Sequence, residues 1–475
     1  MAPFRIFARF VMVKATMTVR TFNLVVPLAY EATAMRIADT ARHGSGESGA
    51  VSPLIGASLR QGDVDSTNTR STLPTTTMPG IRISTTATRT TTTSRLSSAP
   101  ARSADYPGCH HADFSFADLV QAYLDCRHTK RNSASAAAFE QDQERNLADL
   151  RDQLRDGTYQ PGQSICFVVM RPRAREVWAA EFRDRIVHHL LYNHIANRFY
   201  RSFISDTCAC IPGRGTLYAT QRLEAKIRSA SQNWSRPVWY LKCDLANFFV
   251  DIDKNILWKQ IAARVTEPWW LWLAGVVLFH DPRLNFEARG HQHLFDQVPS
   301  HKRLLNQPDN RGLPIGNLSS QFFANIHLDA LDQFAKHQVG ARHYVRYVDD
   351  FILLHESPQW LNRALARIGA FLPERLGARL NPSKTILQPA DRGVDFVGHV
   401  IKPWHTRARR RTVDQAIERI RTVDPVGLHA TANSYFGLLR QANSSHADRA
   451  QLARAVLRRG HCVNQTFTKS YRRTT

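Results

Sequence analysis

The sequence predicts an α+β domain built on an antiparallel sheet and preceded by a long segment without a fold of its own. Three observations lead to this prediction. Expected strands and helices are intermixed without the regular βαβ alternation of a parallel sheet. Apolar runs flank the acidic turn Tyr347-Val348-Asp349-Asp350, a pattern typical of a strand–turn–strand hairpin. Residues 1–104 are dominated by Thr, Ser and Arg and show no sustained apolar period.

The N-terminal segment, residues 1–104, is expected to be disordered, because its composition cannot offset the entropy lost on ordering. Its first thirty residues contain several basic side chains and no acid before Glu31, which loosely resembles a transit peptide. A start codon assigned too far upstream would give the same composition, and we weigh that interpretation at least equally. No catalytic residue is expected there.

From Phe114 onward, apolar spacing predicts regular elements in a definite order. The expected helices are 116–124, 139–154, 181–200, 316–334 and two further helices starting near Val413 and Thr431; the expected strands are 165–170, 240–244 and the two arms of the hairpin within 344–354. The apolar stretch Trp269–Phe279 is too short for a membrane span and follows Pro268, so we expect a buried helix.

Composition points to a polyanionic partner. The chain has 475 residues, with 63 Lys and Arg against 40 Asp and Glu, a formal net charge of +23. Such an excess favours nucleic acid over an anionic membrane surface, since no segment could cross a bilayer. The seven cysteines are scattered, and Cys208-x-Cys210 has neither metal-knuckle nor redox spacing. We therefore expect a reducing, intracellular setting and no structural zinc.

Asp349 and Asp350 are adjacent carboxylates within an apolar run. Burying them unpaired would cost several kcal/mol, and they also repel each other. A bound divalent cation removes both penalties, and oxygen donors of this kind suit Mg²⁺. Taken alone, the pair is better interpreted as a solvated acidic turn. Asp244, at the end of an earlier expected strand, supplies the third carboxylate that two-metal phosphoryl transfer requires.

These motifs, in this order, resemble those of reverse transcriptases. Asp244-Leu-Ala-Asn-Phe-Phe249 resembles their first palm motif, and Tyr347-Val-Asp-Asp350 resembles their catalytic hairpin. The resemblance runs from about residue 114 to 460. It implies a right-hand polymerase, with N-terminal helices and fingers in 105–235, a palm with an antiparallel sheet in 236–402, and a helical thumb with a basic tail in 403–475. The implied activity is RNA-templated transfer of dNTPs to a primer 3′-OH.

The resemblance also implies roles for single residues. The implied catalytic residues are Asp244, Asp349, Asp350 and Lys384, the last as proton donor to pyrophosphate; the implied metal ligands are Asp244, Leu245, Asp349 and Asp350, holding two Mg²⁺ ions for which Mn²⁺ can substitute. The implied dNTP-binding residues are Arg171, Arg175, Phe249, Ile315, Gly316, Gln321 and Tyr347. The implied template and primer contacts are Arg214, Gly215, Phe396, Gly398 and His399.

Several of these residues have simpler interpretations that stay open. Phe249, the implied steric gate against a 2′-hydroxyl, could be an ordinary core side chain, and Lys384 a solvated surface charge. Arg183 or Arg185 could form a structural pair with Asp184. His399 is either a primer-side contact or a satisfied polar residue.

The segment Leu313-Pro-Ile-Gly-Asn-Leu-Ser-Ser-Gln321 indicates the subtype. Retroviral, retron and group II intron enzymes usually carry Gln-Gly-x-x-x-Ser-Pro here, whereas this chain has Ile315 in place of the Gln and Gln321 in place of the Pro. The form resembles diversity-generating retroelement enzymes, which copy template RNA with errors mainly at adenines. An apolar side chain in place of an amide removes a polar check on base-pair geometry, so we expect weaker discrimination.

Two alternatives remain. The polymerase could serve a defence system, a retron or a group II intron, although no Cys/His-rich endonuclease module follows the thumb. The chain could instead be an inactive RNA-binding scaffold, but a scaffold has no reason to retain buried carboxylates. The implied partners are template RNA, a DNA or RNA primer, dNTPs and a small basic helical-bundle accessory protein, in a bacterial cytoplasm and without a membrane.

Overall fold

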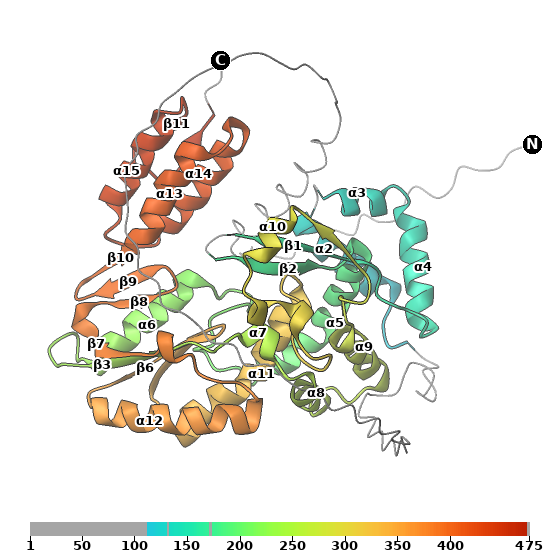
Figure 1. Ribbon diagram of the computed structural model, residues 1–475, viewed down its shortest axis with the longest axis horizontal. Coiled ribbons are helices and arrows are strands. Elements are labelled where there is room, and N and C mark those ends of the chain that lie inside the picture. Colours follow the sequence, from blue (N-terminus) through green and yellow to red (C-terminus); the bar gives the residue numbers. More distant parts are fainter. Residues whose placement is uncertain (1–111, 131–132, 171–172, 473–475) are drawn as a thin grey trace, which may run out of the picture. The chain divides into compact units, whose positions relative to one another are not determined.

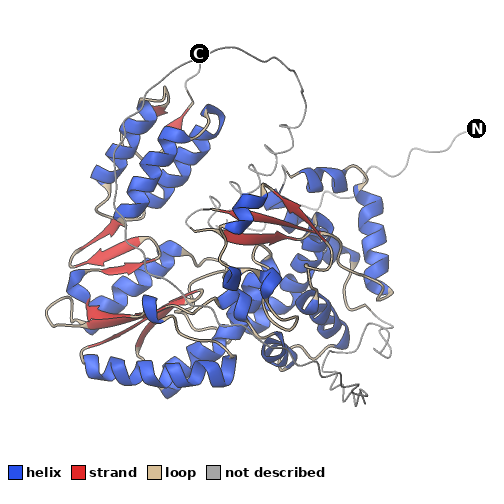
Figure 2. Ribbon diagram, viewed as in Figure 1, coloured by secondary structure: helices blue, strands red, loops and turns tan. Residues whose placement is uncertain are grey.

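The computed structural model describes residues 112–130, 133–170 and 173–472. The N-terminal segment 1–104, with the expectations of disorder and of a transit peptide, lies outside these residues. The fold is a mixture of helices and small sheets, as the sequence predicts (Figure 1 and Figure 2).

A central four-stranded sheet is antiparallel throughout, with the strand order β5-β6-β3-β7. Its strands are β3 Trp239–Cys243, β5 His343–Tyr347, β6 Asp350–His355 and β7 Ile386–Pro389. The predicted hairpin and the predicted strand before Asp244 are therefore confirmed, although β7 gave no sequence signal that we used.

Helices cover both faces of the central sheet, α6 (Thr216–Ala230) on one and α12 (Pro358–Phe371) on the other (Figure 1). Alternate residues of β6 therefore enter different cores: Phe351 and Leu353 share a cluster with Leu361 of α12, whereas Ile352 packs with Leu223 of α6. Burial on both faces explains why these strands are continuous apolar runs instead of alternating with polar residues.

A second sheet has the order β2-β1-β4, and its strands come from distant parts of the chain. Strands β1 (Ser164–Val169) and β2 (Arg175–Ala179) form an antiparallel hairpin, and β4 (Phe286–Arg289) joins β1 in parallel. Helix α10 (Gln292–Asp296) contacts β1, and the other helices before α11 are α2 Phe116–Lys130, α3 Ala134–Glu140, α4 Gln143–Arg155, α5 Phe182–Tyr200, α7 Phe248–Asp251, α8 Lys254–Ala262 and α9 Pro268–Phe279. The expected helix 139–154 is two helices, because the chain turns at Gln141 and Asp142.

Helix α11 (Leu318–Gln333) is buried along most of its length and packs against α5 and α8. It is the predicted helix 316–334, starting two residues later. The buried helix predicted for Trp269–Phe279 is α9, with Pro268 in its first turn. Within the described ranges, no helix has both the length and the apolar character needed to cross a bilayer. The six cysteines in these ranges are all free thiols.

The C-terminal part consists of a small sheet and a helical unit. The sheet has the order β10-β9-β8, and the helices share an apolar core of their own. Their bounds are β8 Val394–Phe396, β9 His399–Lys402, β10 His405–Ala408, α13 Arg410–Thr422, α14 Pro425–Leu439, α15 His446–Leu457, β11 Cys462–Val463 and β12 Ser470–Tyr471. Helices were predicted here, with the second starting at Pro425 instead of near Thr431.

Candidate active site

The central sheet brings Asp244 and Asp350 together at one end. Cys243, the last residue of β3, pairs with Phe351, so Asp244 leaves the sheet beside Asp350. Burial raises the pKa of the Asp350 carboxyl, the Lys242 ammonium opposes that rise, and the negative charge and hydrogen bonding of Asp244 add to it. Two predicted site residues from distant strands thus meet.

Asp349 occupies the turn between β5 and β6, which is closed by the pairing of Tyr347 with Asp350. Burial raises the pKa of the Asp349 carboxyl to about 7, and the negative charges of Asp350 and Asp244 contribute. Three carboxylates crowded in this way resist ionising together. Strong perturbation of this kind is typical of functional sites.

Lys384 joins the same cluster from a short 3₁₀ turn, Pro382–Lys384. Its Nζ lies 2.5 Å from Asp244 Oδ2, and the side-chain amide of Asn381 donates to the same oxygen at 3.2 Å. The backbone N–H of Asn381 also donates to the Asp244 carbonyl oxygen at 2.8 Å. Lys384 is therefore not merely a solvated charge, and Asn381 is a neighbour of the site that the sequence did not reveal.

The turn that carries Asp349 has a strained backbone, and a buried hydrogen-bond network holds it in place. Val348 has φ +56°, a left-handed conformation that β-branched residues rarely adopt. Its carbonyl oxygen accepts a hydrogen bond from Arg346, whose guanidinium is fully buried and pairs through two nitrogens with Asp332 of α11. Thr207 and Tyr344 also donate to Asp332. A fully paired buried network of this kind can hold a backbone conformation that would otherwise relax.

The carboxylates fit a hard divalent cation by donor type. They provide oxygen ligands, and a cation would relieve the crowding that raises the pKa values of Asp349 and Asp350. Their arrangement is not that of a closed metal cage: in the described part of the chain, no group of three or more His, Cys, Asp or Glu side chains is placed to hold a metal ion. Here the positive charges next to the carboxylates are Lys384 and Lys242. Leu245, the other implied ligand, is buried next to Asp244.

Four of the implied dNTP-binding residues lie in α7 and in the segment that leads into α11. Phe249 is half-buried in α7, next to Phe248, and its carbonyl oxygen accepts from the N–H of Leu313. Ile315 and Gly316 lie in the segment before α11, and Gln321 in its first turn receives a hydrogen bond from the Cys210 thiol at 3.4 Å.

Gly316 is needed where it stands. It has φ +125°, and a Cβ there would lie 2.8 Å from a methyl carbon of Val177 and 3.0 Å from the carbonyl oxygen of Trp178. A side chain would therefore separate this segment from β2. Tyr347, another of the implied dNTP-binding residues, is half-buried, and its ring packs against that of Phe396.

The arginines of the β1–β2 connection are described only in part. Arg171 lies outside the described residues, Arg173 is exposed, and Arg175 begins β2. Arg183 forms an ion pair with Asp184 at 3.7 Å and lies over the Tyr159 ring. These contacts of Arg183 fit the interpretation that it forms a structural pair with Asp184.

Two implied primer contacts need correction. Phe396 is fully buried in a core cluster, and His399 is 1% exposed and lies beside Thr220 of α6. Phe396 of β8 and His399 of β9 are a cross-strand pair, and the burial of both keeps their side chains away from a primer at the surface. Gly398, between them, has φ +90° and open space where a Cβ would be, so its backbone remains available.

Arg214 and Gly215 lie in the loop before α6. One guanidinium nitrogen of Arg214 donates to the carbonyl oxygens of Ile204 and Thr207, both at 2.7 Å. Gly215 precedes the first residue of α6 in an extended conformation. Arg214 thus stabilises this loop through one guanidinium nitrogen. Only its other guanidinium nitrogens are left to bind a phosphate of the template or primer.

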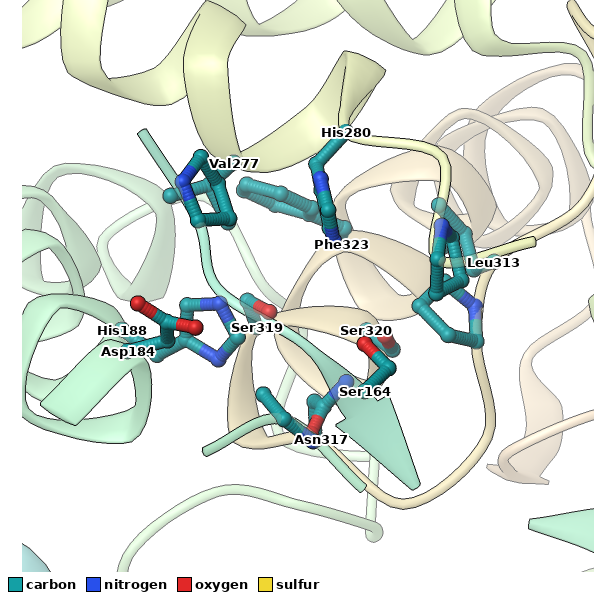
Figure 3. Close-up of a pocket in the computed structure, with 14 residues that line it drawn as sticks. Ser164, Asp184, His188, Val277, His280, Leu313, Asn317, Ser319, Ser320 and Phe323 are labelled. Atoms are coloured by element: carbon teal, nitrogen blue, oxygen red, sulfur yellow. The ribbon is translucent and has the colours of Figure 1, made fainter. Parts of the chain in front are cut away.

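A small pocket lined by both polar and apolar side chains lies beside the segment that leads into α11, and no sequence pattern indicated it. Figure 3 shows Asp184 and His188 of α5 on one side, Asn317, Ser319 and Ser320 near the start of α11, and His280 and Leu313 across from them. Asp184 accepts hydrogen bonds from the Tyr159 hydroxyl and the Gly162 N–H, both at 2.8 Å. Burial lowers the pKa of His188 to about 3, so its ring is neutral.

Comparison with known proteins gives a family match for part of the chain. Residues 174–401 match the family described as reverse transcriptase (RNA-dependent DNA polymerase). No curated protein matches the chain. Similar solved structures include telomerase from Candida albicans with a fragment of telomeric RNA, at 14% identity and a TM-score of 0.37 over 63% of this chain and 54% of that one. Another is apo telomerase from Candida tropicalis truncated from its C-terminal domain, at 12% identity and a TM-score of 0.38 over 52% and 55%.

This chain spans about half the length of those telomerase chains. The matched residues 174–401 include Asp244, the hairpin with Asp349 and Asp350, and Lys384. Residues 174–401 are therefore a reverse transcriptase domain, the domain of RNA-directed DNA polymerases.

Proposed function

We propose that this chain copies RNA into DNA and that Asp244, Asp349 and Asp350 form its catalytic centre. The observation that carries the proposal is the meeting of these carboxylates, from two strands and a turn, at one end of the antiparallel sheet of a reverse transcriptase domain. The raised pKa values of Asp349 and Asp350 support it, since such crowding opposes folding and needs a functional reason.

The reaction joins the primer 3′-oxygen to the α-phosphorus of a dNTP and breaks the bond from that phosphorus to pyrophosphate. Reverse transcriptases use divalent metal ions, and two Mg²⁺ ions held by the three carboxylates and the Leu245 carbonyl would supply Lewis-acid stabilisation of the attacking and leaving oxygens. Mn²⁺ would substitute. The carboxylates must be ionised to act, so Asp349 limits the reaction below neutral pH.

Lys384 is proposed to donate a proton to the leaving pyrophosphate. Its Nζ is held beside Asp244, within the cluster where that charge would develop. A positioned general acid contributes about 10²-fold or more to the rate. Asn381 shares the Asp244 oxygen and would keep that carboxylate oriented when Lys384 turns away.

The dNTP would lie between the start of β2 and the segment before α11. Arg175 would bind the triphosphate together with Arg171, Phe249 would exclude a 2′-hydroxyl, and Ile315, Gly316, Gln321 and Tyr347 would surround the nascent base pair. Arginine suits this task because its planar fork binds phosphate oxygens in pairs.

The finer proposal is a diversity-generating retroelement enzyme that makes errors at template adenines. It rests on the Ile-Gly-x-x-x-Ser-Gln form of residues 315–321, in which an apolar side chain replaces an amide. Ile315 is half-buried beside Trp178 and Lys302. A polymerase of a defence system or intron is the alternative, and a small basic helical-bundle accessory protein would be the partner in the first case. Template RNA and a primer are partners in both.

Extension of a DNA primer on an RNA template tests the proposal. Purified wild-type protein with Mg²⁺ should extend the primer, and Asp349→Ala should not, while both bind the template–primer with similar affinity. If the wild-type protein binds but never extends any primer, with Mg²⁺ or Mn²⁺, the inactive-scaffold alternative replaces this proposal.

A further inference from the structure

We propose that Asn317 is a positioning residue that ties β2 to the start of α11, so that the groups binding the dNTP phosphates and the nascent base pair move as one unit. This inference rests on the proposed function. It adds a residue that the motif resemblance did not assign to any role.

Asn317 occupies the N-cap position of α11 but does not cap it with its side chain. Asparagine is favoured at N-caps because its side-chain oxygen normally accepts an N–H of the first helical turn. Here Asn317 Oδ1 instead accepts the backbone N–H of Ala180, 3.1 Å away, directly after β2. The residue as a whole is 6% exposed. The residue thus gives up a local stabilising bond for one that spans 137 positions in the chain.

The two residues before Asn317 also contact β2. The Trp178 N–H donates to the Ile315 carbonyl oxygen at 2.7 Å, and Gly316 lies so close to Val177 and Trp178 that no Cβ would fit. Three consecutive residues, 315–317, are therefore fastened to β2 by backbone or side-chain contacts.

Strand β2 connects the two ends of the proposed dNTP site. Arg175 is its first residue, and Ala180 follows its last residue, so about five residues or roughly 17 Å of extended chain separate them. The strand is paired with β1 along its length, which limits bending. A shift of Arg175 toward a bound triphosphate would thus be transmitted to residues 315–317 through the Trp178 and Ala180 hydrogen bonds together, with the Asn317 side chain holding the end of the segment that leads into α11.

The pocket beside Asn317 explains why its hydrogen bond with the Ala180 N–H matters. Asn317 lines the pocket together with polar side chains such as Asp184 and Ser319 and apolar ones such as Phe323, so one side of its side chain borders a cavity (Figure 3). The Asn317–Ala180 hydrogen bond therefore adds to the Trp178–Ile315 hydrogen bond and the close approach of Gly316 in holding the start of α11 against β2. Losing the hydrogen bond would also leave the buried Ala180 N–H without this acceptor, at a cost that favours separation.

Steady-state primer extension with three substitutions tests this role. Asn317→Ala removes both the tie and the capping residue, Asn317→Ser restores only a good N-cap because its hydroxyl is too short to reach Ala180, and Asn317→Asp keeps the acceptor oxygen. We expect Ala and Ser to raise the KM for dNTPs about tenfold, the effect of one buried hydrogen bond, with kcat changed about twofold or less. Asp should restore the KM, because it keeps an acceptor oxygen at the same place.

Two outcomes would overturn the inference: a Ser variant that restores the KM, which would make Asn317 only a helix cap, or a fall in thermal stability without any change in KM. Tyr159→Phe is the control, since it loosens the pocket through Asp184 without touching β2 and should leave the KM within about twofold. A wild-type protein inactive in the same assay would instead count against the proposed function.

Discussion

Arg346 donates a hydrogen bond to the carbonyl oxygen of Val348, 3.0 Å away, so a fully buried guanidinium supports the turn that carries Asp349. The charge of Arg346 is balanced by Asp332 of α11, at 2.6 and 2.7 Å. The position of the proposed catalytic turn therefore depends on a helix that contributes no catalytic side chain.

Replacing Asp332 by Asn should destabilise the protein strongly, because it leaves the Arg346 charge buried without its counter-ion. We expect a loss of about 3–5 kcal/mol in the free energy of unfolding, measured by urea denaturation. Asp329→Asn is the matched control on the same helix, since Asp329 pairs with the partly exposed Arg264 and should cost less. Equal losses in the two variants would contradict the role given to Arg346.

Asp349→Asn should make the protein more stable at pH 8 when a chelator is present. The folded-state pKa of Asp349 is raised to about 7 from an ordinary value of 3.8. The wild-type protein therefore loses stability as the pH rises between those values, and an uncharged amide does not. We expect the melting temperature of the variant to exceed that of the wild type by a few degrees at pH 8 and to match it below pH 4. A difference independent of pH would refute this explanation.

Lys384→Met should slow primer extension and shift its pH profile. The Lys384 charge lowers the pKa values of both Asp349 and Asp350, so its removal raises them, and the acid limb of activity should move to higher pH. Loss of the proposed proton donor should reduce the rate about 10²-fold. Lys384→Arg keeps the charge and should leave the acid limb near its wild-type position. An unshifted limb in the Met variant would show that Lys384 does not act on these carboxyls.

Ile315→Gln should reduce misincorporation opposite template adenines, since it restores an amide that can test base-pair geometry. The measurement is sequencing of cDNA made on a defined RNA template, with errors counted at each template base. The Ile315 carbonyl contact with Trp178 uses only backbone, so the substitution should not displace the segment. An unchanged adenine error rate would remove Ile315 from the proposal.

Much of the fold could be predicted because its signals are local. The strand before Asp244, the hairpin around Asp349 and helix α5 each have an apolar pattern that one window of sequence contains. The family resemblance implied Asp244, Asp349 and Lys384 as site residues; the register of β3 and β6 places Asp244 beside Asp350, and Lys384 reaches Asp244 from a 3₁₀ turn.

The features that could not be predicted depend on contacts between residues far apart in the chain, which patterns in a single sequence do not encode. A buried arginine in a strand gives no hint that its partner is Asp332, and Asn317 looks like an ordinary helix cap. Phe396 and His399 were assigned to the primer from a motif, but that motif does not show on which face of a short strand each side chain lies. Their burial corrected the assignment.

Single-turnover primer extension on an RNA template, comparing wild type with Asp244→Asn and Asp349→Asn, tests the central claim most directly. If these carboxylates perform nucleotidyl transfer, each variant should bind the template–primer as tightly as wild type and extend it at least about a thousandfold more slowly, a loss of roughly 4 kcal/mol of transition-state stabilisation. Extension by either variant at the wild-type rate would contradict the claim.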